Sequence, residues 1–376
     1  MSDFQPFDME RMMSRFEQEV DYNLSESGVH PLRLDELLAF QRDSVKRLLS
    51  ADLNYPHVNG IPELRERIAA LYRGAAPANV LVTVGAAEAN YISIRTLLSR
   101  DDEIAIMLPN YMQICGIAKN HGLNIVPFHL REGDGWAPDL DELESGLTPK
   151  TKLIAVCNPN NPTGRILTED EMDRIVACAE RAGAWILADE VYRGATRVND
   201  DENPSFYGRY DKILAVGSMS KAYALPGLRI GWVAGPAGTL DQIWARHEYT
   251  TISAAMLSNV LAALALSPKV RPRLLERTRN YIRRGFPVLL DWIESHPGLF
   301  SLRPPDAAAI AFIRYHLEVN STLFAERLRR EKSVLIVPGD HFGMDHFLRV
   351  SFGLPHDVLV PALERIRELV LELGGR

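Results

Sequence analysis

The chain has 376 residues, a length that predicts two domains rather than one. Apolar residues make up 46% and charged residues 24%, which is the ordinary balance of a globular protein. The net charge of −7 argues against nucleic acid and against an anionic membrane as partners.

The cysteines and the N-terminus indicate which compartment and which kinds of site to expect. Cys115, Cys157 and Cys178 lie far apart without a CxxC motif, which predicts buried free thiols and no metal site. The N-terminus lacks the basic and apolar regions of a signal peptide. No apolar run approaches the ~18 residues needed to cross a bilayer. We therefore expect a cytoplasmic protein that does not enter membranes.

The first part of the chain, residues 1–49, is expected to form an N-terminal arm and a linking helix. Residues 7–20 predict a short amphipathic helix, and a loop with Gly28 follows. Residues 34–49 predict a second helix, and residues 63–72 predict a charged helix in the next part of the chain.

From residue 80 onward strands and helices alternate, which is typical of a parallel sheet with crossover helices. The predicted strands are 80–84, 103–108, 124–128, 153–157, 185–188, 213–216 and 230–234. Thr168 and Glu171 form a capping box for one helix, which Gly183 ends. We expect an α/β fold whose large domain, residues 50–260, holds this mainly parallel seven-stranded sheet. Ligands of such sheets bind at the carboxyl ends of the strands.

The C-terminal part, residues 261–376, predicts a smaller α+β domain. A long helical region follows Ser253 and ends near Ser295. Strands are predicted at 308–315, 334–337 and 347–352, with helices at 321–331 and 357–373. The N-terminal arm is expected to pack with this domain.

A lysine placed directly after a buried strand is the main chemical signal. Residues 217–231 read Gly-Ser-Met-Ser-Lys-Ala-Tyr-Ala-Leu-Pro-Gly-Leu-Arg-Ile-Gly, and Lys221 stands there among small residues. A poorly solvated lysine loses its charge easily, as a Schiff-base lysine must. Ser218 and Arg229 can both reach an anion. The alternative is a surface lysine in a Gly/Ser turn.

Two further motifs precede this lysine in the chain. Residues 158–164 read Asn-Pro-Asn-Asn-Pro-Thr-Gly, and residues 188–192 read Ala-Asp-Glu-Val-Tyr. In this order and spacing the three motifs resemble the fold-type I pyridoxal-phosphate enzymes of the class I/II aminotransferase family. The resemblance covers about residues 24–352. It implies the PLP-transferase fold and pyridoxal 5′-phosphate (PLP) as the cofactor.

The resemblance also implies roles for single residues. Lys221 matches the lysine that bonds to PLP and shuttles the substrate proton. Asp189 matches the carboxylate that pairs with the pyridinium nitrogen, with a helix N-cap as the alternative. Tyr192 and Asn161 match the two donors to the phenolic oxygen of the ring, although a tight turn would also explain Asn161. Tyr111 matches the aromatic ring stacked on the pyridine, or is a core tyrosine.

The phosphate needs N–H donors and cations. Gly85-Ala86-Ala87 leads from a strand into a helix and predicts an anion site at the helix N-terminus. Ser218 and Arg229 add a hydroxyl and a charge. Many relatives carry a hydroxyl or a lysine where Ala87 stands, so we expect this phosphate site to depend more on backbone and on Arg229.

Tyr55, in the pattern Tyr-x4-Gly-x3-Leu-Arg, resembles the tyrosine that reaches the phosphate from a neighbouring subunit. The resemblance therefore implies a homodimer in which the two subunits complete each other's active sites.

Arg349 is the main substrate signal. It lies on an otherwise apolar strand, and a buried unpaired charge is costly, so it needs an anionic partner. Its planar fork suits the α-carboxylate of an amino acid, and the family uses an arginine at this position in that way. Asn161 is expected to contact the substrate as well. Gly28 is also expected to contact it, because it lies in the arm that folds over the mouth of the site in the resembled family.

These residues predict a PLP-dependent enzyme acting on an L-amino acid, most simply an aminotransferase. The same residues also support a lyase, a cyclase or a decarboxylating deaminase. Residues 22–31 and 248–253 are similar to a natural-product subgroup that includes capreomycidine-synthase-like cyclases and lincosamide-pathway PLP enzymes. A regulator or scaffold without turnover is disfavoured, because Lys221, Asp189 and Arg349 are all present.

The substrate side chain is left open by the sequence. The carboxylates of Glu17, Glu26 and Glu88 either meet a basic side chain at the mouth of the site or belong to the solvated surface and a helix first turn.

Overall fold

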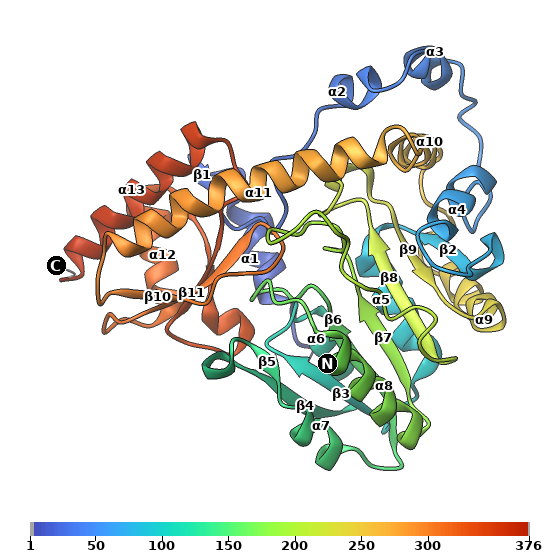
Figure 1. Cartoon of the computed structure of the whole chain (residues 1–376), viewed down its shortest axis with the longest axis horizontal. Coiled ribbons are helices and arrows are strands. Elements are labelled where there is room, and N and C mark those ends of the chain that lie inside the picture. The colour runs from blue at the N-terminus through green and yellow to red at the C-terminus, as the bar shows by residue number, and fades with distance from the viewer. Residues whose placement is uncertain (1–3, 375–376) are drawn as a thin grey trace.

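The computed structural model describes residues 4–374. Its larger sheet has the strand order β2-β9-β8-β7-β6-β3-β4-β5 (Figure 1). Seven strands match those expected: β2 (Val80–Thr83), β3 (Glu103–Leu108), β4 (Asn124–Arg131), β6 (Thr151–Cys157), β7 (Trp185–Asp189), β8 (Ile213–Ser218) and β9 (Gly231–Ala234). The eighth, β5 (Ala137–Pro138), is an addition to the prediction, because two residues cannot show an alternating pattern.

The sheet is parallel through its centre and antiparallel at β5 and β9. β9 pairs antiparallel with both β2 and β8, because the chain between β8 and β9 turns back without a crossover helix. β3, β4, β6, β7 and β8 run parallel. Their carboxyl ends therefore lie along one edge of the sheet.

Helices cover both faces of this sheet, because side chains alternate along each strand. Ile104 and Ile106 of β3 belong to the apolar cluster under α5 (Gly85–Leu97), α6 (Gln113–Asn120) and α9 (Ala237–His247). Ala105 and Met107, the residues between and after them, belong to the cluster under α7 (Leu140–Gly146) and α8 (Glu169–Ala182).

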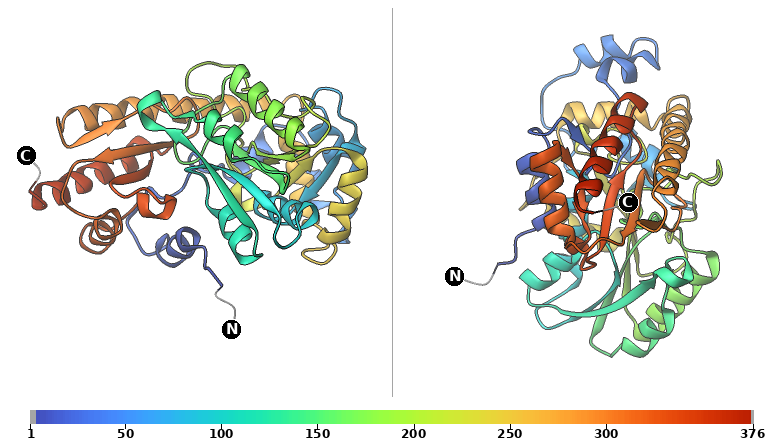
Figure 2. Two further views of the ribbon diagram at one scale, coloured as in Figure 1. Left: turned by 90° about the horizontal axis from the view of Figure 1, so that it is seen from below. Right: turned by 90° about the vertical axis from the view of Figure 1, so that its left-hand side faces the viewer.

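A second, antiparallel sheet has the order β10-β11-β14-β13. Its strands are β10 (Phe300–Leu302), β11 (Ile310–Tyr315), β14 (Phe347–Ser351) and β13 (Val337–Pro338). The accompanying helices are α11 (Arg271–Glu294), α12 (Ser321–Lys332) and α13 (His356–Glu372), and Figure 2 shows them beside this sheet.

The single strand expected at 334–337 is wrong. β12 (Val334–Leu335) pairs in parallel with β1 (Tyr22–Asn23) of the N-terminal arm, whereas β13 pairs with β14. Apolar periodicity cannot show that two halves of one run have different partners. The pairing with β1 anchors the arm beside the second sheet.

Several helices also differ in their bounds from the prediction. The N-terminal helix α1 is Asp8–Phe16, and α4 is Pro62–Ala69. The single helix expected over 34–49 is two short helices, α2 (Leu34–Ala39) and α3 (Ser44–Leu49). Asp43 separates them with φ at 65°, a left-handed conformation that interrupts a helix.

The long helical region after Ser253 consists of two helices, α10 (Met256–Ala265) and α11. α10 crosses residue 260, and the domain boundaries at 49 and 260 stay predictions. Cys115, Cys157 and Cys178 are buried and free. Among residues 4–374 no helix has the length and apolar character needed to traverse a bilayer.

Candidate active site

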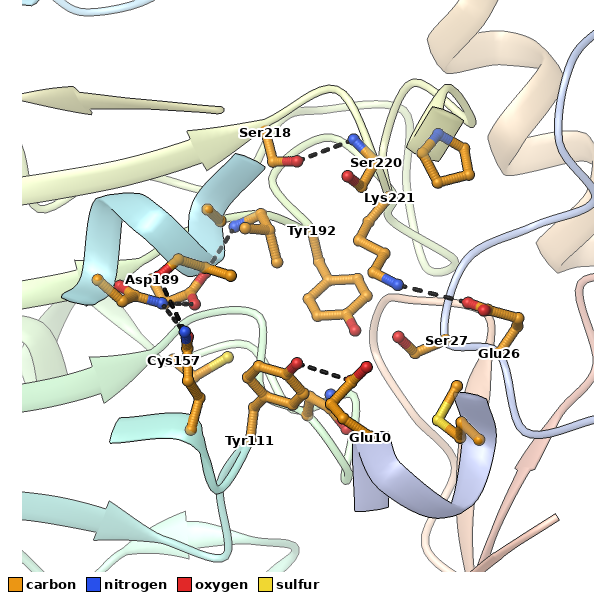
Figure 3. Close-up of a pocket in the computed structure, with 18 of the residues that line it drawn as sticks. Glu10, Glu26, Ser27, Tyr111, Cys157, Asp189, Tyr192, Ser218, Ser220 and Lys221 are labelled. Atoms are coloured by element: carbon orange, nitrogen blue, oxygen red, sulfur yellow. Dashed lines mark hydrogen bonds and ion pairs between the residues drawn. The ribbon is translucent and has the colours of Figure 1, made fainter. Parts of the chain in front are cut away.

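One cavity of ≈ 260 Å³ lies at the carboxyl edge of the larger sheet and extends to the second sheet and the N-terminal arm (Figure 3). It brings together ten of the site residues predicted from the sequence: Ala86, Ala87, Tyr111, Asn161, Asp189, Tyr192, Ser218, Lys221, Arg229 and Arg349. These residues come from segments far apart in the chain, so the fold alone makes them neighbours.

Lys221 lies just beyond the end of β8. Its side chain is 23% exposed, and its Nζ lies 3.7 Å from Oε2 of Glu26. The turn that carries it is held by the hydrogen bond from the Met219 N–H to the Ile230 carbonyl, at 2.9 Å. The Ser218 hydroxyl also accepts a bond from the Ser220 N–H, at 2.9 Å. The backbone that carries Lys221 is therefore held in place, and its amine points into the cavity.

Asp189 ends β7 with a buried carboxylate. Asn90 of α5 donates to its Oδ2 at 2.9 Å, and the Val191 N–H donates to its Oδ1 at 3.2 Å. Burial raises the pKa of Asp189, while the bond from Asn90 and the charge of Lys221 act in the opposite direction. A cationic ring nitrogen in the cavity would give this carboxylate the partner that favours its charged form.

The start of α5 forms the opposite side of the cavity. Gly85 has φ at 75°, and a Cβ there would lie 2.5 Å from Nη2 of Arg229. A Cβ on Gly231 would lie 2.5 Å from the Ala86 nitrogen, so only glycine permits this approach. The first N–H groups of a helix have no partner within it. Together with the Arg229 guanidinium they make a site for an anion.

Two tyrosines and an asparagine line the centre of the cavity. The Tyr111 hydroxyl donates to Oε1 of Glu10 at 2.7 Å. Burial raises the pKa of both Tyr111 and Tyr192, so both hydroxyls stay protonated donors near neutral pH. Asn161 accepts a hydrogen bond from Arg349 through its Oδ1 at 3.1 Å.

Arg349 reaches the cavity from β14, where it lies opposite Phe312 of β11. It is 2% exposed, and its guanidinium donates to Asn161 and to the Ser25 carbonyl of the arm. Within residues 4–374 its Nε has no hydrogen-bond partner and no carboxylate lies within ion-pair distance. This buried cation is paired with neutral oxygens, which leaves the anionic partner expected from the sequence to a ligand.

Two predicted residues do not line the cavity. Tyr55 is 86% exposed and lies outside it, so a contact with the phosphate would have to be made in another subunit. Gly28 stands behind the lining, where an added Cβ would lie 3.5 Å from the Ser220 carbonyl and 3.7 Å from Cδ of Lys221. It supports the lysine turn at close range.

The three carboxylates considered as partners of a basic side chain, Glu17, Glu26 and Glu88, lie in different environments. Glu26 lines the cavity, while Glu17 lies outside its lining. Glu88 is buried in the first turn of α5, where it accepts hydrogen bonds from the Val84 N–H at 2.7 Å and from the Thr251 hydroxyl at 2.7 Å. Glu88 therefore helps to hold the start of α5, which is the helix-first-turn alternative given for it above.

Several lining residues were not predicted as site residues: Glu10, Met13, Ser27, Asn90, Gln113, Cys157, Val191, Ser220 and Pro226. Asn90 had one available signal, since it is an amide among the apolar residues of α5. Glu10 had none, because α1 is brought to Tyr111 only by tertiary packing.

The donor set fits PLP. The start of α5 and Arg229 suit a phosphate dianion. Asp189 suits a protonated ring nitrogen, and Lys221 supplies a primary amine in the same cavity.

Comparison with known proteins agrees with this fit. The family model described as aminotransferase class I and II matches residues 37–366. The chain is 31% identical to capreomycidine synthase of Streptomyces vinaceus over 94% of this chain and 90% of that protein. It is 26% identical to an aspartate aminotransferase of Pyrococcus horikoshii over 87% and 86% of the two chains.

Among solved structures, a PLP-dependent aminotransferase from Streptococcus suis superposes with a TM-score of 0.92 at 32% identity, covering 99% of both chains. The match extends over both sheets and the arm. The protein is therefore a member of the class I and II aminotransferase family, with the fold-type I architecture and PLP as its cofactor.

Proposed function

We propose that the protein is an aminotransferase that moves the amino group of an L-amino acid to an oxo acid. The observation that carries this proposal is the convergence of Lys221, Asp189 and Arg349 on one cavity. An amine, a buried carboxylate and a buried guanidinium are groups with which the protein can hold PLP and an amino acid and move the α-proton, and transamination is the simplest reaction that uses them.

Each group has a distinct task. PLP, when bound, withdraws electrons from Cα of the substrate. Asp189 accepts the ring N–H and keeps that nitrogen protonated. Lys221 Nζ takes the proton from Cα, and the guanidinium of Arg349 with the Asn161 amide orients the α-carboxylate.

We also propose that the working form is a homodimer. Its motivation is Tyr55, which matches the family's phosphate-binding tyrosine yet lies outside the cavity of its own subunit. A second subunit would supply this hydroxyl to the phosphate end.

A second candidate is an elimination or cyclisation at the same cofactor. It is favoured by the similarity to capreomycidine synthase and by Glu26, whose carboxylate lies 3.7 Å from Lys221 Nζ. In such a reaction this carboxylate would lie beside the substrate side chain, next to the amine that takes the α-proton.

Turnover with and without an oxo acid separates the two candidates. The holoenzyme is incubated with a panel of L-amino acids while the cofactor absorbance is followed, and products are identified by mass. Transamination stops after one equivalent unless pyruvate or 2-oxoglutarate is added, whereas elimination or cyclisation continues without an acceptor. Multiple turnovers in the absence of any oxo acid would overturn the aminotransferase assignment.

A further inference from the structure

The wall of the cavity carries charges of both signs. The positive charge is the buried guanidinium of Arg349, whose Nε has no hydrogen-bond partner within residues 4–374. The negative charges are two carboxylates at the mouth, Glu10 of α1 and Glu26 of the arm (Figure 3). Arg349 donates to the Ser25 carbonyl, next to Glu26 in the chain, so the two kinds of charge are neighbours. An anion is attracted to Arg349 and a cation to the carboxylates.

Among the described residues neither carboxylate has a cation that serves it alone. Glu10 accepts a hydrogen bond from the Tyr111 hydroxyl, and among the described residues it has no ion-pair partner. Glu26 has one cation in reach, Lys221, at 3.7 Å. That lysine is the attachment point for the cofactor, so its amine is not reserved for Glu26.

A third carboxylate lies close enough to feel the other two. Burial and then the negative charges of Glu26 and Glu10 raise the pKa of Glu17. Like charges gathered at the mouth of a cavity cost free energy unless a cation joins them, and they focus a field that attracts cations.

The arrangement identifies the substrate side chain. With its carboxylate on Arg349 and its amino group at Lys221, an amino acid can extend its side chain only toward parts of the wall still unassigned. The phosphate end is closed by Arg229 and the start of α5. The mouth, with Glu10 and Glu26, is the part of the wall that offers charge.

Resting on the proposed function, we infer that the substrate is an α-amino acid with a cationic side chain, a guanidinium or an ammonium group, held by Glu10 and Glu26. These two glutamates are then specificity-determining residues. Arg349 selects the amino acid end, and the carboxylates select the charge at the other end.

Matched pairs of ligands test this inference, because each pair shares its α-amino and α-carboxylate groups. L-Arginine is compared with L-citrulline, which is uncharged and nearly the same shape, and L-ornithine with L-norvaline. The half-saturating concentration is measured from the cofactor absorbance of the holoenzyme. The shift in Tm of the holoenzyme at fixed ligand concentration gives a readout that needs no turnover.

The cationic member of at least one pair should half-saturate at a concentration about 10- to 100-fold lower than its neutral partner, as expected for a hydrogen bond to a charged group. The pair that shows the difference tells guanidinium from ammonium. Glu26→Gln and Glu10→Gln keep the side-chain shape and should bring the ratio toward one. Glu19→Gln, an exposed residue of the same arm, should leave the ratio unchanged.

The outcomes separate this inference from the proposed function. If neutral amino acids change the absorbance and bind as tightly as cationic ones, the inference is overturned and the aminotransferase assignment stands. If no amino acid changes the absorbance, the assignment itself fails. If the ratio is large but both Gln variants retain it while folding with unchanged Tm, another part of the wall selects the cation and the role of Glu10 and Glu26 is refuted.

Discussion

Replacement of Arg349 by lysine tests how the substrate carboxylate is held. Arg349 is 2% exposed and already donates to Asn161 and Ser25, so its position is fixed before any ligand binds. Lysine keeps the positive charge but loses the planar fork that can bind a carboxylate through two parallel hydrogen bonds. The change therefore removes geometry rather than charge.

The expected loss follows from these contacts. A bidentate charge-assisted pair in a buried site is worth on the order of 2–5 kcal/mol. Arg349→Ala, which removes the whole pair, should lower kcat/KM by roughly 30- to 4,000-fold, and Arg349→Lys, which keeps the charge, should lower it by less. Both variants should retain the cofactor absorbance, because Arg349 lies outside the phosphate end. Arg349→Ala should add a loss of stability, since it also breaks the contact with the Ser25 carbonyl and leaves a void.

The assay compares an L-amino acid with its α-amide at equal cofactor content. Wild type should discriminate strongly between them, and Arg349→Lys much less. Arg314→Lys is the matched control: Arg314 lies on β11 of the same sheet, pairs with Glu132 and should leave kcat/KM unchanged. Loss of PLP from Arg349→Lys, with unchanged kinetics per bound cofactor, would show that Arg349 is structural and refute the reasoning.

Three further perturbations test other parts of the site. Lys221→Ala should lose the covalent cofactor bond, and an adduct reducible by borohydride at another lysine would contradict the assignment. Tyr55→Ala and Lys221→Ala subunits, each inactive alone, should regain activity when mixed and re-associated, because one site per mixed dimer is intact; a fully active monomer would sink the idea. At Glu88, burial raises the pKa, but the hydrogen bonds from His247, Thr250 and Val84 together lower it to about 2 from the usual 4.5. A depressed pKa contributes stability above about pH 4.5 that is lost as the pH falls toward 2, so Glu88→Gln should lower the free energy of unfolding by about 3 kcal/mol at pH 7. Denaturant unfolding across this range should show the difference shrinking, and a pH-independent difference would count against this account.

The sequence by itself determined the main sheet and the centre of the site. β8 is buried along its whole length and β7 at every residue except Trp185, so each appears as an apolar run. Lys221 was predicted because it follows such a run among small residues, and Asp189, at the end of another run, because its motif resembles that of the class I/II aminotransferases. Arg349 was found because a charge stands out on an apolar strand.

Only the tertiary structure decided which distant residues complete these motifs. Asn90 contacts Asp189, Glu10 contacts Tyr111, and the Ser25 carbonyl contacts Arg349. The partners are 99, 101 and 324 residues apart in the sequence. No periodicity links such pairs, because their distance depends on how the arm and α5 pack against the sheets.

The same reason explains why Glu88 and Glu26 lie in different environments. Glu88 and Glu26 are equally polar in the sequence, yet the helix that carries Glu88 turns it toward His247 and Thr251, while the path of the arm sets Glu26 beside Lys221. Local sequence specifies which element a side chain belongs to. Long-range packing decides whether that side chain holds two elements together, as Glu88 does, or lines the cavity, as Glu26 does.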